Sequence, residues 1–76
     1  MGDFKVEPIP ETFLDRLKKE HAELEERTGK LDSFVGTTPF LQLTIADQDD
    51  LVEQLRYMQM YLHVLHRRVT RIVQKH

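Results

Sequence analysis

Arginine and tyrosine side chains gather in the last third of the chain, where their spacing fits about four turns of one α-helix. The set consists of Arg56, Tyr57, Tyr61, Arg67, Arg68 and Arg71. Guanidinium groups bind phosphate oxygens in a bidentate way, and tyrosine and arginine planes stack on nucleotide bases. These residues are therefore the candidate site for a small anionic ligand. A structural interpretation is simpler, because tyrosines also serve as amphipathic residues at the edge of a helix interface.

Charge is distributed unevenly along the chain, whose formal net charge is −2. Residues 1–53 hold all 13 acidic residues and 6 of the 11 Lys and Arg residues, which leaves a net charge of −7. Residues 54–76 hold the other 5 cations and no acid. Cations near the end of a helix complement its dipole, and they can also pair with acids on an antiparallel neighbour. That interpretation competes with anion binding, and the negative total charge argues against duplex nucleic acid as a partner.

Residue patterns that catalyse reactions are missing from the sequence. The three glycines are scattered and form no phosphate loop, Ser33 is the only serine, and there is no cysteine. The carboxylates fall on helix faces that we expect to be exposed, so no acid–base pair is indicated. We therefore expect a protein that is not an enzyme and that uses no cofactor.

Four histidines raise the question of a metal site. His63 and His66 are three residues apart and share one helix face, and His21 is expected to lie close to His63 in an antiparallel hairpin. No acidic residue follows position 53 to complete a ligand set from the same helix. We expect surface histidines rather than a metal centre.

The long stretch from Gln48 to His76 would position the arginines. Its apolar residues recur at alternating spacings of four and three, a heptad pattern without proline or glycine. They are Leu51, Leu55, Met58, Leu62, Leu65, Val69 and Ile72. This stripe is flanked on both sides by Val52, Tyr57, Tyr61, Val64 and Val73. One antiparallel partner covers only a narrow stripe, so the flanks predict self-association into a dimer or a higher oligomer.

An earlier stretch, residues 11–35, carries a matching heptad stripe. It consists of Leu14, Leu17, His21, Leu24, Thr28, Leu31 and Val35. Polar residues within such a stripe often fix register or oligomeric state, which is our interpretation of His21 and Thr28, with a ligand-facing role as the alternative. Gly29 costs roughly 1 kcal/mol relative to alanine within a helix. It therefore indicates a close backbone approach or a local bend.

The ends of the helices are marked by capping residues. Gly36 is expected to end the first helix and Thr38 to cap a short helical turn over residues 39–43. Thr44 and Asp47 resemble a capping box, so the second long helix should cover residues 45–75. Prolines 8 and 10 keep residues 1–10 out of a helix, and we expect an extended arm there. Residues 11–76 then form one helical hairpin domain.

The composition supports an all-α fold. Hydrophobic residues make up 39% and charged residues 32% of the 76 residues, which suits amphipathic helices in one small domain. No apolar run is long enough to span a membrane and no signal peptide is visible, so we expect a cytoplasmic protein. The predicted fold is an antiparallel hairpin of two long amphipathic helices, joined by a short helical turn and self-associating into a helical oligomer.

Residues 16–34 and 47–69, with Phe40 between them, resemble a family of small phage-encoded helical-hairpin proteins named after a protein of a crAss-like phage. The matching positions are Arg16, Leu17, Glu20, Leu24, Arg27, Lys30, Leu31, Phe34, Phe40, Leu43, Gln48, Leu51, Gln54, Leu55, Met58, Tyr61, Leu65 and Arg68. Thr28 and Gly29 depart from the apolar–polar pair that is typical at that point.

The resemblance implies a phage or prophage origin. More loosely, the chain is similar in size and design to phage sponge proteins, small helical oligomers that sequester the cyclic nucleotide signals of CBASS or Thoeris immunity without cleaving them. That similarity implies an anti-defence protein that sequesters a cyclic oligonucleotide in the host cytoplasm. The arginine and tyrosine set would contact phosphates and bases, and Lys30 would be a further cation. The alternative is a helical protein–protein interaction module that inhibits or adapts a host protein.

Overall fold

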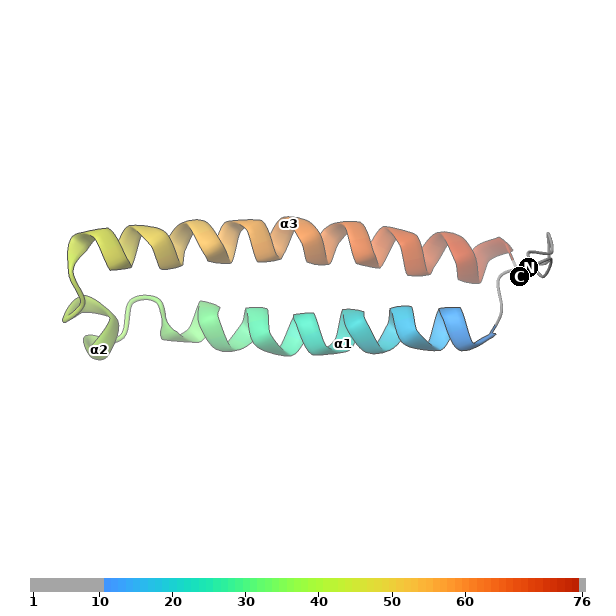
Figure 1. Cartoon of the computed structure of the whole chain (residues 1–76), viewed down its shortest axis with the longest axis horizontal. Coiled ribbons are helices and arrows are strands. Elements are labelled where there is room, and N and C mark those ends of the chain that lie inside the picture. The colour runs from blue at the N-terminus through green and yellow to red at the C-terminus, as the bar shows by residue number, and fades with distance from the viewer. Residues whose placement is uncertain (1–10, 76) are drawn as a thin grey trace, which may run out of the picture.

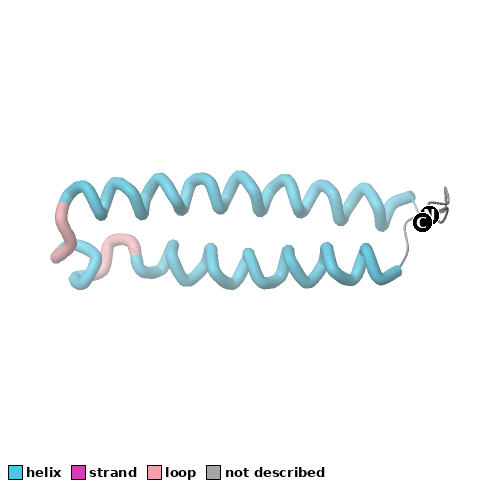
Figure 2. The backbone as a smooth tube through the Cα atoms, viewed as in Figure 1, coloured by secondary structure: helices cyan, strands magenta, loops and turns pink. Residues whose placement is uncertain are grey.

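The computed structural model describes residues 11–75, all of which belong to three helices and the two connections between them. These are α1 (Glu11–Phe34), α2 (Thr38–Leu41) and α3 (Ile45–Lys75). The long helices α1 and α3 lie side by side and antiparallel, and α2 closes one end (Figure 1). The hairpin measures 54 × 26 × 15 Å, so it is a single layer of helices. Between residues 11 and 75 the backbone leaves the helical conformation only at the α1–α2 and α2–α3 connections (Figure 2).

The predicted all-helical fold and the pairing of two long helices are confirmed, whereas self-association stays a prediction. Helix α1 ends one residue before its expected end, and α2 covers residues 38–41 instead of 39–43. The expected arm, residues 1–10, lies outside the described residues. No helix within residues 11–75 is long and apolar enough to cross a membrane.

A glycine and a threonine make the turn that ends α1. Gly36 has φ +92°, a left-handed conformation that glycine adopts without steric cost, as expected at a helix C-terminus. Thr37, and not the expected Thr38, is the N-cap of α2. Its hydroxyl donates to the Phe34 carbonyl at 2.7 Å and accepts from the Phe40 amide at 3.3 Å. One hydrogen bond joins Thr37 to the last turn of α1 and the other joins it to α2, so Thr37 links the two helices.

The start of α3 follows the predicted capping pattern. The Asp47 amide donates to the Thr44 hydroxyl at 3.1 Å. The Gln48 side-chain amide donates to the carbonyls of Leu41 and Leu43, at 3.2 and 3.0 Å, and so fixes the α2–α3 connection. Phe40 is buried edge-on against the Phe34 ring, with the ring centroids 5.8 Å apart. The apolar side of α2 therefore plugs this end of the hairpin.

The core is the contact between the two heptad stripes. Leu17, Leu24 and Leu65 form a buried cluster, and Leu65 is fully buried. The rest of the α3 side of this cluster is half-buried and consists of Met58, Leu62, Val69 and Ile72. We call the seven α3 residues of the predicted stripe, Leu51, Leu55, Met58, Leu62, Leu65, Val69 and Ile72, the inner stripe. Leu55 and Leu65 are its two buried members, and the other five are half-buried.

Thr28 and Gly29 are adjacent in α1 but have different surroundings. Thr28 is buried within the α1 stripe, and its hydroxyl oxygen has no hydrogen-bond partner among the described residues. Gly29 is exposed, and a Cβ atom built on it would meet nothing within 4 Å. Of the two alternatives for Gly29, the close backbone approach is therefore wrong, whereas the local bend stays a prediction.

Candidate functional site

Three of the predicted arginines line two adjoining grooves on α3. The first groove, of about 410 Å³, lies between Arg56 and Arg67. Its other lining residues are Gln59, Met60, His63 and Val64. The second groove, of about 240 Å³, is lined by His66, Arg67, Thr70, Arg71 and Gln74. Arg67 belongs to both, so the two grooves form one surface, which we call the arginine grooves.

Helix periodicity brings these side chains together. Residues three or four apart lie on the same face of an α-helix, so Arg56, Met60, His63 and Arg67 follow one another on successive turns. Arg56 and Arg67 are separated by roughly 16 Å at about 1.5 Å per residue. The first groove therefore has a guanidinium group at each end and the apolar side chains of Met60 and Val64 between them. This arrangement can hold an anionic group at either end and an apolar or planar group in the middle.

Acidic side chains are absent from the lining of both arginine grooves. All five lining or neighbouring arginine and histidine side chains, Arg56, His63, His66, Arg67 and Arg71, are exposed. None of these arginines forms an ion pair with a described side chain of residues 13–74. Guanidinium groups that keep their hydrogen-bond donors accessible are available to an anion from solution.

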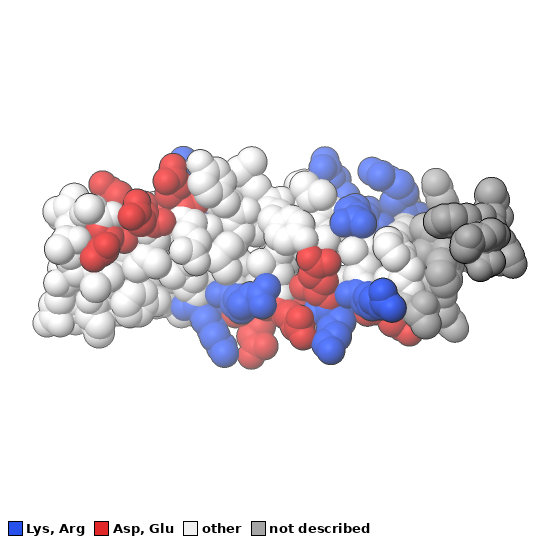
Figure 3. Space-filling view, in the orientation of Figure 1, with Lys and Arg blue, Asp and Glu red and all other residues white. Residues whose placement is uncertain are grey.

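Arg56 stands at a boundary in the charge pattern of α3. On its N-terminal side it lines a further groove of about 310 Å³ with Asp49, Asp50, Val52 and Glu53. Figure 3 shows the same change of sign, with acids over the first turns of α3 and cations over its later turns. Helix α1, in contrast, carries both signs interspersed (Figure 3). The arginine grooves are therefore the part of α3 at which positive charge is concentrated.

The two predicted tyrosines are bound to carboxylates and lie outside the arginine grooves. The Tyr57 hydroxyl donates to Glu53 at 3.3 Å, one turn back along α3. The Tyr61 hydroxyl donates across the hairpin to Glu20 on α1. This hydrogen bond raises the pKa of Tyr61, with smaller contributions from desolvation and from the negative charge of Glu20, while Arg68 lowers it. Tyr61 thus ties α3 to α1.

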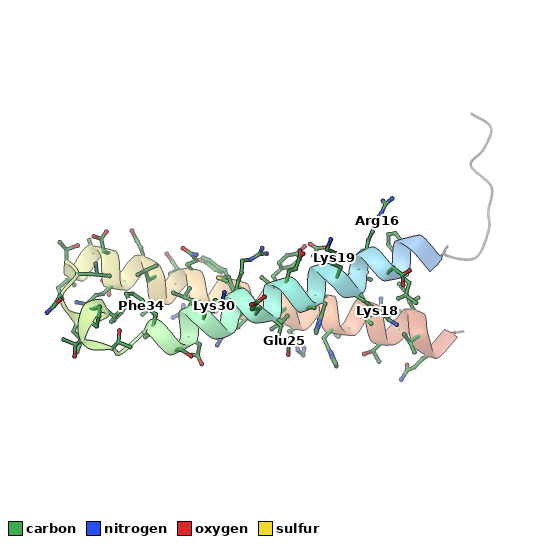
Figure 4. The ribbon with its side chains drawn as sticks, turned by 90° about the horizontal axis from the view of Figure 1, so that it is seen from below. Arg16, Lys18, Lys19, Glu25, Lys30 and Phe34 are labelled. Atoms are coloured by element: carbon green, nitrogen blue, oxygen red, sulfur yellow. The ribbon has the colours of Figure 1, made fainter. Side chains whose placement is uncertain are left out.

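Arg68 and Lys30 also lie apart from the arginine grooves. Arg68 is near enough to Tyr61 to affect its pKa, which places it on the opposite flank of α3 from Arg56 and His63. Lys30 projects from α1, between Glu25 and Phe34 along that helix (Figure 4), and pairs with Glu26 at 3.5 Å. The structure therefore brings together Arg56, Arg67 and Arg71 but not the whole predicted set.

Histidines line another groove of about 310 Å³ between the two long helices, which shares Gln59, His63 and His66 with the arginine grooves. It is lined by His21, Glu25, Gln59, Leu62, His63 and His66. His21 shares this groove with His63, as expected, and its ring lies against His66, with ring centroids 5.7 Å apart. The described residues contain no group of three or more His, Cys, Asp or Glu side chains placed to hold a metal ion.

The ligand site predicted from the sequence did not include Gln59, Met60 and Val64, which line the first arginine groove. Their helical spacing from Arg56 and Arg67 could have identified them.

Comparison with known families adds one finding. The family model described as Sequestin matches residues 11–71, which span α1, α2 and most of α3. Searches of curated proteins and of solved structures found no match to this chain.

Proposed function

This chain belongs to the Sequestin family, and we propose that it sequesters a small anionic ligand, such as a cyclic oligonucleotide, without changing it chemically. The family name indicates sequestration of some ligand. The observation that carries the proposal is the pair of arginine grooves, which are lined by Arg56, Arg67 and Arg71 without an acid among the lining residues. Phosphates would bind the guanidinium groups.

We place this binding in the context that the resemblance implies, a phage protein that withholds a nucleotide signal of bacterial immunity in the host cytoplasm. Each molecule of a sequestering protein removes only as many signal molecules as it has binding sites. It must therefore bind the signal tightly, and it leaves the signal chemically unchanged. Bidentate arginine contacts supply affinity for phosphate, and the exposed position of the grooves gives the ligand direct access from solvent. No chemical step is needed for this function.

Binding and recovery of the ligand test the proposal together. Cyclic dinucleotides and trinucleotides are titrated into the protein by isothermal calorimetry at two salt concentrations, and the bound nucleotide is recovered by heating and identified by mass spectrometry. We expect binding that weakens with salt, because exposed ion pairs are screened, and recovery of the unaltered nucleotide. If none of these ligands binds, the proposal is contradicted. Recovery of a cleaved product would indicate an enzyme instead.

A second candidate function, a module that binds a host protein, is favoured by the exposed apolar residues of α3. Tyr57, Met60 and Val73 are 58%, 60% and 48% exposed. Docking through such side chains buries apolar surface and therefore persists at high salt. A host protein retained on the immobilised chain in high salt, and lost with Met60→Asp but kept with Arg67→Ala, would support this candidate over ligand sequestration.

A further inference from the structure

A second heptad stripe runs along the face of α3 that points away from α1. Its members follow one another at alternating spacings of three and four, and all of them are exposed. They are Asp50, Glu53, Tyr57, Met60, Val64, Arg67 and Arg71, and we call them the outer stripe. Two stripes on opposite faces of one helix can each hold a helical neighbour. The inner stripe has α1 as its neighbour, and within residues 11–75 the outer stripe has none.

The order of residue types along the outer stripe is the decisive feature. Acids come first at Asp50 and Glu53, apolar side chains occupy the middle, and arginines come last at Arg67 and Arg71. Reversing the direction of the helix places the acids where the arginines were. The stripe is therefore complementary to a reversed copy of itself, which is the requirement for a two-fold symmetric interface. A parallel copy would instead align acids with acids and arginines with arginines, which is repulsive.

We infer that a second copy of this chain docks antiparallel on the outer stripe of α3 and forms a symmetric dimer. In an antiparallel pair of α3 helices, the residues of the two outer stripes lie opposite one another when the two-fold axis crosses α3 at the level of residue 62, on the face of the outer stripe. Met60 of each copy then packs on Val64 of the other. Tyr57 lies against Arg67 of the second copy, a cation–π arrangement, and Glu53 lies against Arg71. Every member of the stripe from Glu53 to Arg71 gains a partner of suitable chemistry.

The shape of the hairpin gives a physical reason for this dimer. The molecule is only 15 Å thick, and the side chains buried within residues 13–74 are five hydrophobic residues and Thr28. Domains of this size commonly gain stability from oligomerisation when disulfides and structural metals are lacking. The outer stripe from Asp50 to Arg71 extends over roughly 32 Å at about 1.5 Å per residue. A second hairpin laid along it converts one layer of helices into two packed layers.

The dimer also changes the proposed ligand site, and this consequence rests on the proposed function. With the axis at the level of residue 62, Arg56 of one copy comes alongside Arg67 of the other. Each open groove then receives a second wall, and the dimer holds two equivalent clusters of arginines from both copies. A groove closed from two sides retains a small anion better than a groove that faces solvent.

Charge reversal with rescue tests the dimer without any ligand. The oligomeric state of the full chain is measured by sedimentation equilibrium over a range of concentrations. We expect Glu53→Arg and Arg71→Glu each to raise the dimer dissociation constant on the order of tenfold, because each places like charges together. The double variant restores both contacts with reversed sign and should return to the wild-type constant. Glu23→Arg, an exposed reversal on α1, serves as the control and should leave it unchanged.

Met60→Asp is the second variant, and it should abolish the dimer because each copy would bury an unpaired carboxylate against Val64 of the other. Circular dichroism confirms that each variant retains its helices. A wild-type chain that stays monomeric at the highest concentration, or a double variant no better than the single ones, would overturn the dimer. Ligand titration is scored separately: wild-type dimers that bind no nucleotide contradict the proposed function only, and monomers that bind nucleotide contradict the dimer only.

Discussion

The inner and outer stripes lie on the same helix with the same heptad spacing, yet they differ in composition and in surroundings. The inner stripe is apolar throughout, and its most buried residue, Leu65, is fully buried. The outer stripe is charged at both ends, and its central Met60 is 60% exposed. Hydrophobic burial is non-directional, so the inner stripe stabilises the hairpin. Charge order is directional, so the outer stripe can select a partner and its orientation. One face of α3 thus stabilises the hairpin, and the opposite face is suited to recognition of a partner.

The largest expected difference between the two stripes is in their contribution to the stability of the single chain, which truncation of one residue in each stripe measures. Leu65→Ala is expected to lower the free energy of unfolding by about 3 kcal/mol, because it leaves a cavity in the buried cluster. Met60→Ala, measured at a concentration at which the chain is monomeric, should change it by less than about 0.5 kcal/mol. Urea denaturation followed by circular dichroism measures both. Equal losses would show that the outer stripe also belongs to the core of the single chain.

Arg67 and Arg68 are adjacent in the sequence, and their alanine variants compare the two flanks of α3 in ligand binding. Arg67 lines both arginine grooves and Arg68 lines neither, so only Arg67→Ala should weaken nucleotide binding. A charged hydrogen bond contributes about 1.5–3 kcal/mol, which corresponds to a loss of about tenfold or more in affinity. Calorimetric titration of a cyclic dinucleotide or trinucleotide measures the effect. Arg68→Ala is the matched control, and equal losses in the two variants would show that the ligand lies elsewhere on α3.

The two glycines of the α1 region offer a smaller test of what the turn requires. Gly29→Ala should raise the free energy of unfolding by about 1 kcal/mol, since the helix gains propensity and the added methyl group meets open space. Gly36→Ala should lower it by about 1 kcal/mol, because φ +92° is strained for any residue with a side chain. Thermal denaturation measures both shifts. A loss of stability on Gly29→Ala would indicate a neighbour on that face of α1.

The smallest expected effect is the pH dependence of the Tyr61–Glu20 contact. The pKa of Tyr61 is higher in the folded chain than in the unfolded chain, so its contribution to stability is present below pH 10 and lost as the pH rises through the folded value. Ultraviolet titration of phenolate formation should show one tyrosine ionising later than the other. Tyr61→Phe should remove that late step, and a late step that persists in this variant would contradict the assignment to Tyr61.

Most of the backbone could be predicted from local sequence. The heptad spacings determined that both long helices form and which side of each is apolar, because side chains three and four apart share a face on any α-helix. Capping chemistry determined the start of α3 at Thr44 and the left-handed turn at Gly36. The same periodicity places Arg56, Met60 and Arg67 on one surface without any knowledge of α1.

Only the tertiary structure decided which side chains meet across the hairpin. The His21 ring lies against His66, Tyr61 reaches Glu20, and the Thr28 hydroxyl is left without a described partner. These pairings depend on the axial register and rotation of α1 against α3, which are fixed by the α2 plug and by the packing of Leu17, Leu24 and Leu65. A shift of a single residue leaves each helix locally unchanged but alters every contact between the helices, so local spacing cannot decide them.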